Sequence, residues 1–297
     1  LVAIVSILSC TKFDHCYKTN WASPDVYVHA CYSDLPALYG ARDLIHKTWP
    51  YSSPQNAVEY PPVTGIIMWA TSLVTPQGIN SYRYYFLINV LLIVIVFAGS
   101  AIILSRIKPE FWYLLPLSPA LILSLYINWD MWAVISALAS IYWFDNRSYT
   151  KSAVSLGLSI ATKFFPIVLL APIVLIFIRR QQITRAIRFV SISLGVWGVI
   201  NLPFIIFNQA GWWRFFKLNS ERNADFGSLW YALQLFGIHI RNLNTISILT
   251  FLIGIAAFAV YFFGVDKTPS LAAVAFTTVA IFTLANKVYS PQYVLWL

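Results

Sequence analysis

The sequence predicts an all-α integral membrane protein, a polytopic bundle of transmembrane helices with extracytoplasmic loops and short re-entrant or juxtamembrane helices. Of its 297 residues, 59% are hydrophobic and only 10% are charged, whereas a soluble domain carries about 25% charged residues. The mean hydropathy is +0.69. The apolar runs are long and continuous, which excludes an alternating outer-membrane barrel, and their hydrophobicity excludes a disordered chain.

The expected elements follow from the lengths of the apolar runs, because a helix needs about 20 apolar residues to cross the hydrocarbon. Residues 1–9 read as the end of one span. Further spans are expected at 84–104, 111–127, 131–144, 189–207, 246–264 and 271–284. In total we expect about nine to eleven crossings.

Two apolar runs do not read as simple spans. Val63–Val74 is short and bounded by prolines, so a re-entrant or interfacial helix is expected there. Ser152–Ile178 is interrupted at Lys163 and Pro166, which predicts either a short hairpin or one kinked span. Because the chain begins and ends inside apolar runs, we interpret residues 1–297 as a single membrane domain truncated at both ends.

The short loops between predicted spans are basic, which makes them cytoplasmic by the positive-inside rule. The opposite, extracytoplasmic side then holds two long polar-aromatic regions, residues 10–62 and 208–245, and eight of the 11 acidic residues. Acidic residues contribute little to topology, so their position independently indicates the face that carries the chemistry. The net charge of +9 is explained by topology and anionic lipids, and no nucleic acid partner is expected.

Three cysteines, Cys10, Cys16 and Cys31, lie near the start of the chain. They form no CxxC or Cys/His pattern typical of zinc, and no metal is expected in the site. An extracytoplasmic first loop would permit one disulfide, with Cys16–Cys31 the most plausible pair.

The first chemical candidate is Asp34, just after the first predicted span. A carboxylate at the membrane edge can accept a proton from a hydroxyl nucleophile, since partial burial raises its pKa toward a useful range. The alternative is an N-cap for the stretch Leu35–Lys47. Glu59 and Tyr60 precede two prolines and a short apolar helix, and a rigid interfacial turn is the alternative there.

Asn128 and Asp130 lie at a tight break between two spans, where they can cap the next helix or face a substrate. Lys163 interrupts an apolar stretch. An intramembrane lysine is energetically expensive and therefore a functional candidate, although one near the interface can also snorkel.

Two further segments combine cations, amides and aromatic residues. Residues 221–231 contain Arg222, Asp225 and Trp230, and residues 286–296 contain Lys287 and Gln292. Arginine binds phosphate oxygens in a bidentate manner, and aromatic faces pack on sugar rings. A solvated loop is the alternative for the first segment. Together Lys163, Arg222 and Lys287 can neutralise a phosphate.

The chain has no GxxxxGK[ST] motif for ATP. A reaction at the extracytoplasmic face therefore needs an activated substrate already present in the membrane, and a lipid-phosphate sugar meets that need. Its phosphate is the leaving group that cations stabilise, while a carboxylate deprotonates the acceptor.

The order of six motifs resembles the bacterial polyprenol-phosphate-sugar-dependent glycosyltransferases of family 87, within the GT-C superfamily. The motifs are CYSDLPALYGARDL (31–44), VEYPPVTG (58–65), NWD (128–130), ATKFFP (161–166), ERNADFGSLWY (221–231) and NKVYSPQYVLWL (286–297). The last is also similar to a segment of the GPI-anchor mannosyltransferases. The resemblance covers nearly the whole chain.

The resemblance implies an inverting, metal-independent transfer on the extracytoplasmic face. It implies that the acidic residue of the first outer loop is the general base, best matched by Asp34, with Asp43 and Glu59 as second choices. Lys163 and Lys287 correspond to the family's donor-phosphate contacts. No DxD motif is present, so a metal-bridged pyrophosphate donor is not supported.

The preferred prediction is a multi-pass cell-membrane glycosyltransferase that moves a sugar, most plausibly mannose, from a polyprenyl phosphate to a lipid or glycan acceptor. Membrane lipids surround it, and no cofactor is expected because the donor is a substrate. The alternative is a membrane transporter or lipid flippase. No internal repeat is found, and the charges cluster at one face, which favours the enzyme. The sugar and acceptor sites are assigned to Asp43, Glu59, Tyr60, Asn128, Asp130, Asp225, Trp230 and Gln292.

Overall fold

The computed structural model describes residues 1–297 as sixteen α-helices and three short 3₁₀ helices, with no strand. The predicted all-α class is confirmed. Three helices are long and apolar enough to cross a membrane, namely α6 (Ser81–Ile107), α12 (Ile183–Phe207) and α15 (Leu243–Gly264). These three helices support the prediction that the chain is a membrane protein. The larger number of crossings expected from the apolar runs is not confirmed.

The remaining longer helices fall below the length of about 20 residues that a perpendicular crossing needs. They are α1 (Val2–Thr11), α5 (Pro62–Val74), α9 (Asp130–Asp145), α10 (Tyr149–Thr162), α11 (Leu170–Arg179), α13 (Gln209–Glu221) and α16 (Leu271–Ala285).

The span expected at 111–127 is wrong as a single helix. The structure has two short pieces there, α7 (Leu114–Leu117) and α8 (Pro119–Ser124). A proline disfavours the helical conformation of the residue before it. Ser118, which precedes Pro119, is accordingly extended, with ψ of 120°.

The interrupted run at 152–178 forms a hairpin, one of the two predicted arrangements. Lys163 is extended and ends α10, and Pro166 lies in the 3₁₀ helix η2 (Phe165–Leu169) before α11. Tyr149 at the start of α10 packs against Phe177 near the end of α11, with ring centroids 5.1 Å apart. The two helices therefore run in opposite directions.

The two long polar-aromatic regions contain more helix than the sequence suggested. The first holds α2 (Asp14–Lys18), α3 (Asp25–Val28), α4 (Asp34–Ala41) and η1 (Leu44–His46). The second holds α13 (Gln209–Glu221) and α14 (Leu229–Leu235), and the chain ends in η3 (Pro291–Trp296). These two regions are too rich in charged residues to be predicted as membrane spans. They nevertheless fold as short helices.

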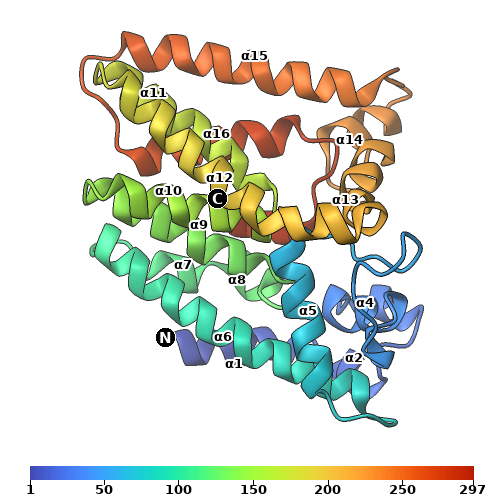
Figure 1. Cartoon of the computed structure of the whole chain (residues 1–297). Helices are drawn as coiled ribbons and strands as arrows, with labels where there is room; N and C mark the ends of the chain where they lie inside the picture. Colours follow the sequence, from blue (N-terminus) through green and yellow to red (C-terminus); the bar gives the residue numbers. More distant parts are fainter.

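Helices α6, α12 and α15 run from one side of the molecule to the other in Figure 1, so their termini define a left end and a right end. The turns that follow α6, α9 and α11, which carry the basic residues, lie at the left. Helices α2, α4, α13 and α14 lie at the right. Helix α5 is drawn crosswise to α6, and its 13 residues span about 20 Å, so it does not reach the basic end. The candidate motifs thus gather at one end of the bundle.

Cys16 and Cys31, the pair that the sequence left open, form a disulfide, which joins the segment after α3 to α2. The bond closes a loop with a sequence separation of 15 residues, and a cross-link over such a loop stabilises a fold by about 3 kcal/mol in the chain-entropy model. We expect Cys16→Ser to lower the thermal midpoint, measured by differential scanning fluorimetry in detergent. The Cys10→Ser variant is the control, because Cys10 forms no disulfide. Equal midpoints for both variants would contradict this.

Candidate active site

A cavity of about 890 Å³ lies between the first loop region, α8, α13 and the C-terminal segment. Four cationic residues line it, Lys12, Arg42, Lys163 and Arg222, together with two carboxylates, Asp34 and Glu59. About half of the lining is apolar. The cavity therefore offers positive charge, carboxylates and an apolar wall in one place.

Asp34 is positioned by the start of α4. Ser33, not Asp34, caps this helix, since its hydroxyl accepts a hydrogen bond from the Leu35 amide at 3.2 Å. The Ser33 hydroxyl donates to the Tyr126 carbonyl at 2.7 Å, and the Asp34 amide donates to the Ile127 carbonyl at 2.7 Å. These bonds attach the start of α4 to the segment before Asp130 and leave the Asp34 side chain free to face the cavity.

The Asp34 carboxylate accepts hydrogen bonds from two phenols and has no cation in direct contact. Tyr32 donates to Oδ1 at 2.9 Å, and Tyr60 donates to Oδ2 at 2.8 Å. Burial raises the pKa of Asp34, and the two hydroxyls and the charge of Lys163 offset that rise in part. Burial and the neighbouring carboxylate also raise the pKa of Tyr60, which keeps its hydroxyl protonated as a donor. Asp34 is thus a partly buried carboxylate poised to accept a proton.

Lys163 projects from the break between α10 and η2 into an aromatic cage. Its ammonium lies 5.3 Å from the centre of the Tyr60 ring, 5.6 Å from Tyr293 and 5.3 Å from Trp296. It also forms an ion pair with Asp130, whose side chain is fully buried. An ammonium has three donors. The pair with Asp130 therefore leaves Lys163 with donors for a ligand.

Asp130 and Asn128 support this lysine and do not line the cavity. The Asp130 carboxylate accepts from Trp296 Nε1 at 2.7 Å as well as from Lys163. Asn128 Oδ1 accepts from the Asp130 amide at 3.0 Å in the turn before α9, whose N-cap residue is Trp129 and not Asn128 or Asp130. Both side chains are buried. Their geometry makes them positioning residues for Lys163 rather than sugar contacts.

Glu59 lines the cavity, where it is held between two arginines that sequence reasoning missed. Arg42 donates to it through Nε at 2.9 Å and through its guanidinium, and Arg214 of α13 lies 3.4 Å away. The three side chains are largely buried, with exposures of 18%, 15% and 24% for Arg42, Glu59 and Arg214. One carboxylate for two cations leaves net positive charge at this wall. The only sequence signal for these arginines was the position of Arg42 directly before Asp43.

Arg222 lines the cavity from the segment after α13 and pairs with Asp225, three residues on. The backbone amide of Asp225 donates to the Lys287 carbonyl at 2.9 Å. Gly227 follows with φ of +80°, and a side chain there would collide with the Tyr289 carbonyl at 2.8 Å. The segments 221–231 and 286–296, which were assigned to phosphate and sugar binding from the sequence, are thus joined through backbone contacts.

Lys287 does not line this cavity. Its ammonium donates to the Ser220 carbonyl at 3.2 Å and also to the Arg222 carbonyl and Asn244. Burial lowers the pKa of Lys287. All three donors of the ammonium are occupied. The structure therefore places Lys287 as a clamp that holds the Arg222 segment against the start of α15.

Three other predicted residues also lie away from the cavity, namely Asp43, Trp230 and Asp225, whose carboxylate pairs with Arg222. Asp43 accepts from Thr48 at 2.5 Å and from His46 at 2.6 Å, and these bonds lower its pKa. Trp230 is buried and donates to the Ala285 carbonyl at 2.8 Å, which attaches α14 to the end of α16. Gln292, in contrast, lines the cavity, and its buried Oε1 has no partner within the chain.

No family model, curated protein or solved structure matches this chain.

Proposed function

We propose that this protein is a membrane glycosyltransferase that uses a polyprenyl-phosphate sugar, most plausibly mannose, as donor. The observation that carries the proposal is the Asp34 carboxylate, held by two phenols in a cavity that Lys12, Arg42, Lys163 and Arg222 also line. A carboxylate without a direct ion pair can take a proton, and the cations suit an anionic leaving group.

The proposed step is a single displacement. An acceptor hydroxyl attacks the anomeric carbon, and Asp34 takes its proton. The bond from the anomeric carbon to the phosphate oxygen breaks, and polyprenyl phosphate leaves with that electron pair. Lys163 and Arg222 stabilise the phosphate as its charge grows. Attack opposite to the leaving group inverts the configuration, and no metal or other cofactor takes part.

The remaining cavity residues have supporting roles in this proposal. Gln292 offers an unpartnered amide oxygen to a sugar hydroxyl. The acceptor in this proposal is a lipid or glycan.

The Cys16–Cys31 disulfide supports an extracytoplasmic site, because disulfides persist in oxidising compartments. The cavity end of the bundle, opposite the basic turns, then faces away from the cytoplasm of a multi-pass cell-membrane protein.

The test is sugar transfer by the full-length protein in proteoliposomes, with radiolabelled polyprenyl-phosphate mannose and a membrane lipid extract as acceptor. We expect a labelled product that depends on the protein and is lost in Asp34→Asn. Translocation of a labelled lipid-phosphate sugar between leaflets, with no product from a panel of donor sugars, would instead support the transporter or flippase alternative.

The pH profile of kcat/KM should show an acid limb set by Asp34. Because burial raises its pKa, the base form appears only as pH rises above the ordinary carboxyl value of about 3.9. The Tyr60→Phe variant removes a hydrogen bond that lowers this pKa, so its limb should move to higher pH. Tyr39→Phe is the matched control, because Tyr39 does not line the cavity and makes no hydrogen bond to Asp34. Identical limbs for Tyr60→Phe and the wild type would exclude Asp34 as the titrating base.

A further inference from the structure

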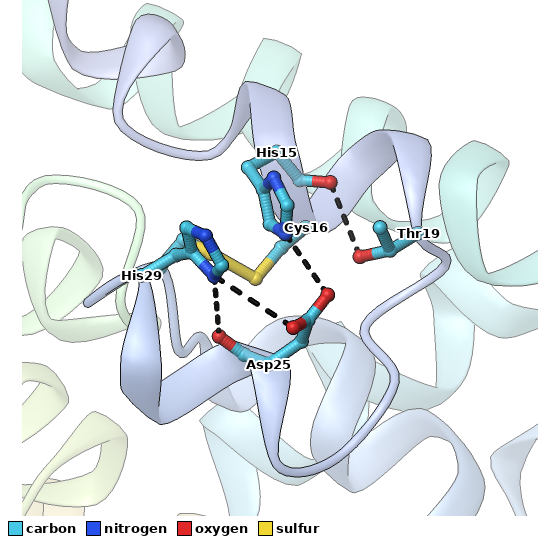
Figure 2. The surroundings of a disulfide bond; sticks show 6 residues. His15, Cys16, Thr19, Asp25 and His29 are labelled. Carbon is cyan, nitrogen blue, oxygen red and sulfur yellow. Dashed lines mark hydrogen bonds and ion pairs between the residues drawn. A yellow bond between two sulfur atoms is a disulfide. The ribbon is translucent and has the colours of Figure 1, made fainter.

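A cluster of three metal-ligating side chains lies outside the candidate active site, beside the disulfide. His15 is on α2, whereas Asp25 and His29 lie at the start and end of α3. In Figure 2 the His15 ring points at the Asp25 carboxylate, and His29 Nδ1 faces both that carboxylate and the Asp25 backbone carbonyl, which is 3.3 Å away. One ligand atom from each residue lies within 4.8 Å of the others. We propose that His15, Asp25 and His29 bind one divalent transition-metal ion, with Zn²⁺ preferred.

The spacing of the ligand atoms suits a tetrahedral ion. Bonds of about 2.0–2.1 Å from Zn²⁺ to nitrogen and oxygen place neighbouring ligand atoms about 3.3 Å apart. His15 Nε2 is 2.9 Å from Asp25 Oδ2, and His29 Nδ1 is 3.7 Å from Asp25 Oδ1. The two distances involve different carboxylate oxygens, and one ligand atom from each residue lies within 4.8 Å of the others, so side-chain rotations would close the set around an ion. Three protein ligands leave the fourth position for water.

The chemistry of the donor set selects the metal. Two imidazoles and one carboxylate favour Zn²⁺, Cu²⁺ or Ni²⁺ over Mg²⁺ and Ca²⁺. The imidazole rings of His15 and His29 stack with centroids 3.6 Å apart. The stack keeps both rings beside the same carboxylate, where a single ion can reach all three side chains. Side-chain exposures of 42%, 38% and 44% for His15, Asp25 and His29 leave the ligands accessible to an ion.

The site has a structural consequence for the cavity. Helix α3 contributes Val26 and Tyr27 to the cavity lining. The Tyr27 ring stacks on Tyr32 with centroids 5.7 Å apart, and Tyr32 donates to Asp34. A metal that joins α2 to α3 adds a second cross-link next to the disulfide and fixes this wall of the cavity.

The test uses the full-length protein in detergent, stripped with a chelator, dialysed and titrated with ZnCl₂ by calorimetry. We expect one Zn²⁺ per chain. His29→Ala should weaken binding by more than about 100-fold, beyond the loss typical of an outer-shell partner. His46→Ala is the matched control, because His46 pairs with a single carboxylate, Asp43, and lacks a third ligand. A non-reducing gel verifies that the disulfide persists in both variants.

Cobalt substitution gives a second readout that does not depend on affinity. Bound Co²⁺ should show the visible absorption of a tetrahedral site in the wild type and in His46→Ala, and not in His15→Ala or Asp25→Asn. Hydrogen exchange across residues 22–32 should slow when Zn²⁺ is added. Equal Zn²⁺ binding by His29→Ala and the wild type, or no stoichiometric binding by the wild type, would overturn the site. Sugar transfer does not enter these measurements, so the proposed function is tested separately.

Discussion

The Asp34→Asn variant should lose sugar transfer by about 10²–10⁴-fold, the usual contribution of a general base, while its fold becomes no less stable. Burial raises the pKa of Asp34 in the folded chain. The favourable contribution of the protonated acid is therefore complete below the ordinary carboxyl pKa and is lost as pH rises through the folded value. At neutral pH the buried carboxylate costs stability, and an amide of the same shape removes that cost.

The measurements are transfer rate and thermal midpoint, both at neutral pH. Asp43→Asn is the matched control, since Asp43 is in the same loop region and its bonds to Thr48 and His46 keep it outside the cavity. We expect the control to retain transfer. A loss of transfer that accompanies a large fall in the midpoint of Asp34→Asn would indicate a structural role. Full activity in Asp34→Asn with loss in Asp43→Asn would move the base to Asp43.

The second large effect is expected at Lys163. The Lys163→Met variant leaves the fully buried Asp130 carboxylate without its cation, and breaking a buried pair in this way destabilises a protein by about 3–5 kcal/mol. A drop in thermal midpoint, measured by scanning fluorimetry, should follow. Lys217→Met is the control, because the Lys217–Glu221 pair is exposed and exposed pairs contribute little.

A double variant separates folding from ligand binding. Adding Asp130→Asn to Lys163→Met removes the uncompensated charge, and the Asn oxygen can still accept from Trp296. We expect the thermal midpoint to recover while donor affinity stays weaker by about tenfold to 100-fold, the value of a hydrogen bond to a charged group. The measurement is displacement of labelled polyprenyl-phosphate mannose by unlabelled donor. Normal donor affinity in the double variant would exclude a phosphate contact by Lys163.

The separation of the candidate motifs from the basic loops was predictable from the sequence. The short loops are predominantly basic, whereas seven of the 11 acidic residues lie in the two long aromatic regions, and this asymmetry is local in the chain. The break at Lys163 and Pro166 was equally local, because a proline and a charge interrupt an apolar run. The span at 111–127 was wrong because hydropathy averages over Pro119, whose effect on Ser118 ends the helix.

The composition of the site was predictable only in part. Asp34, Tyr60, Lys163 and Arg222 were expected and do meet in one region, the first two in direct contact. Arg42 and Arg214 were missed, because their pairing with Glu59 joins α4 to α13, which are far apart in the chain. A surface arginine and a site arginine have the same local sequence signal.

The sequence by itself determined the helical class, the membrane character and the chemical types available at one end of the bundle, since these depend on composition and on the spacing of neighbouring residues. Only the tertiary structure decided which polar groups pair with one another. Lys287 has all its donors taken by Ser220, Arg222 and Asn244, while Asp34 has only two phenols. The His15–Asp25–His29 cluster was likewise invisible, because chain folding and not sequence spacing brings α2 against α3.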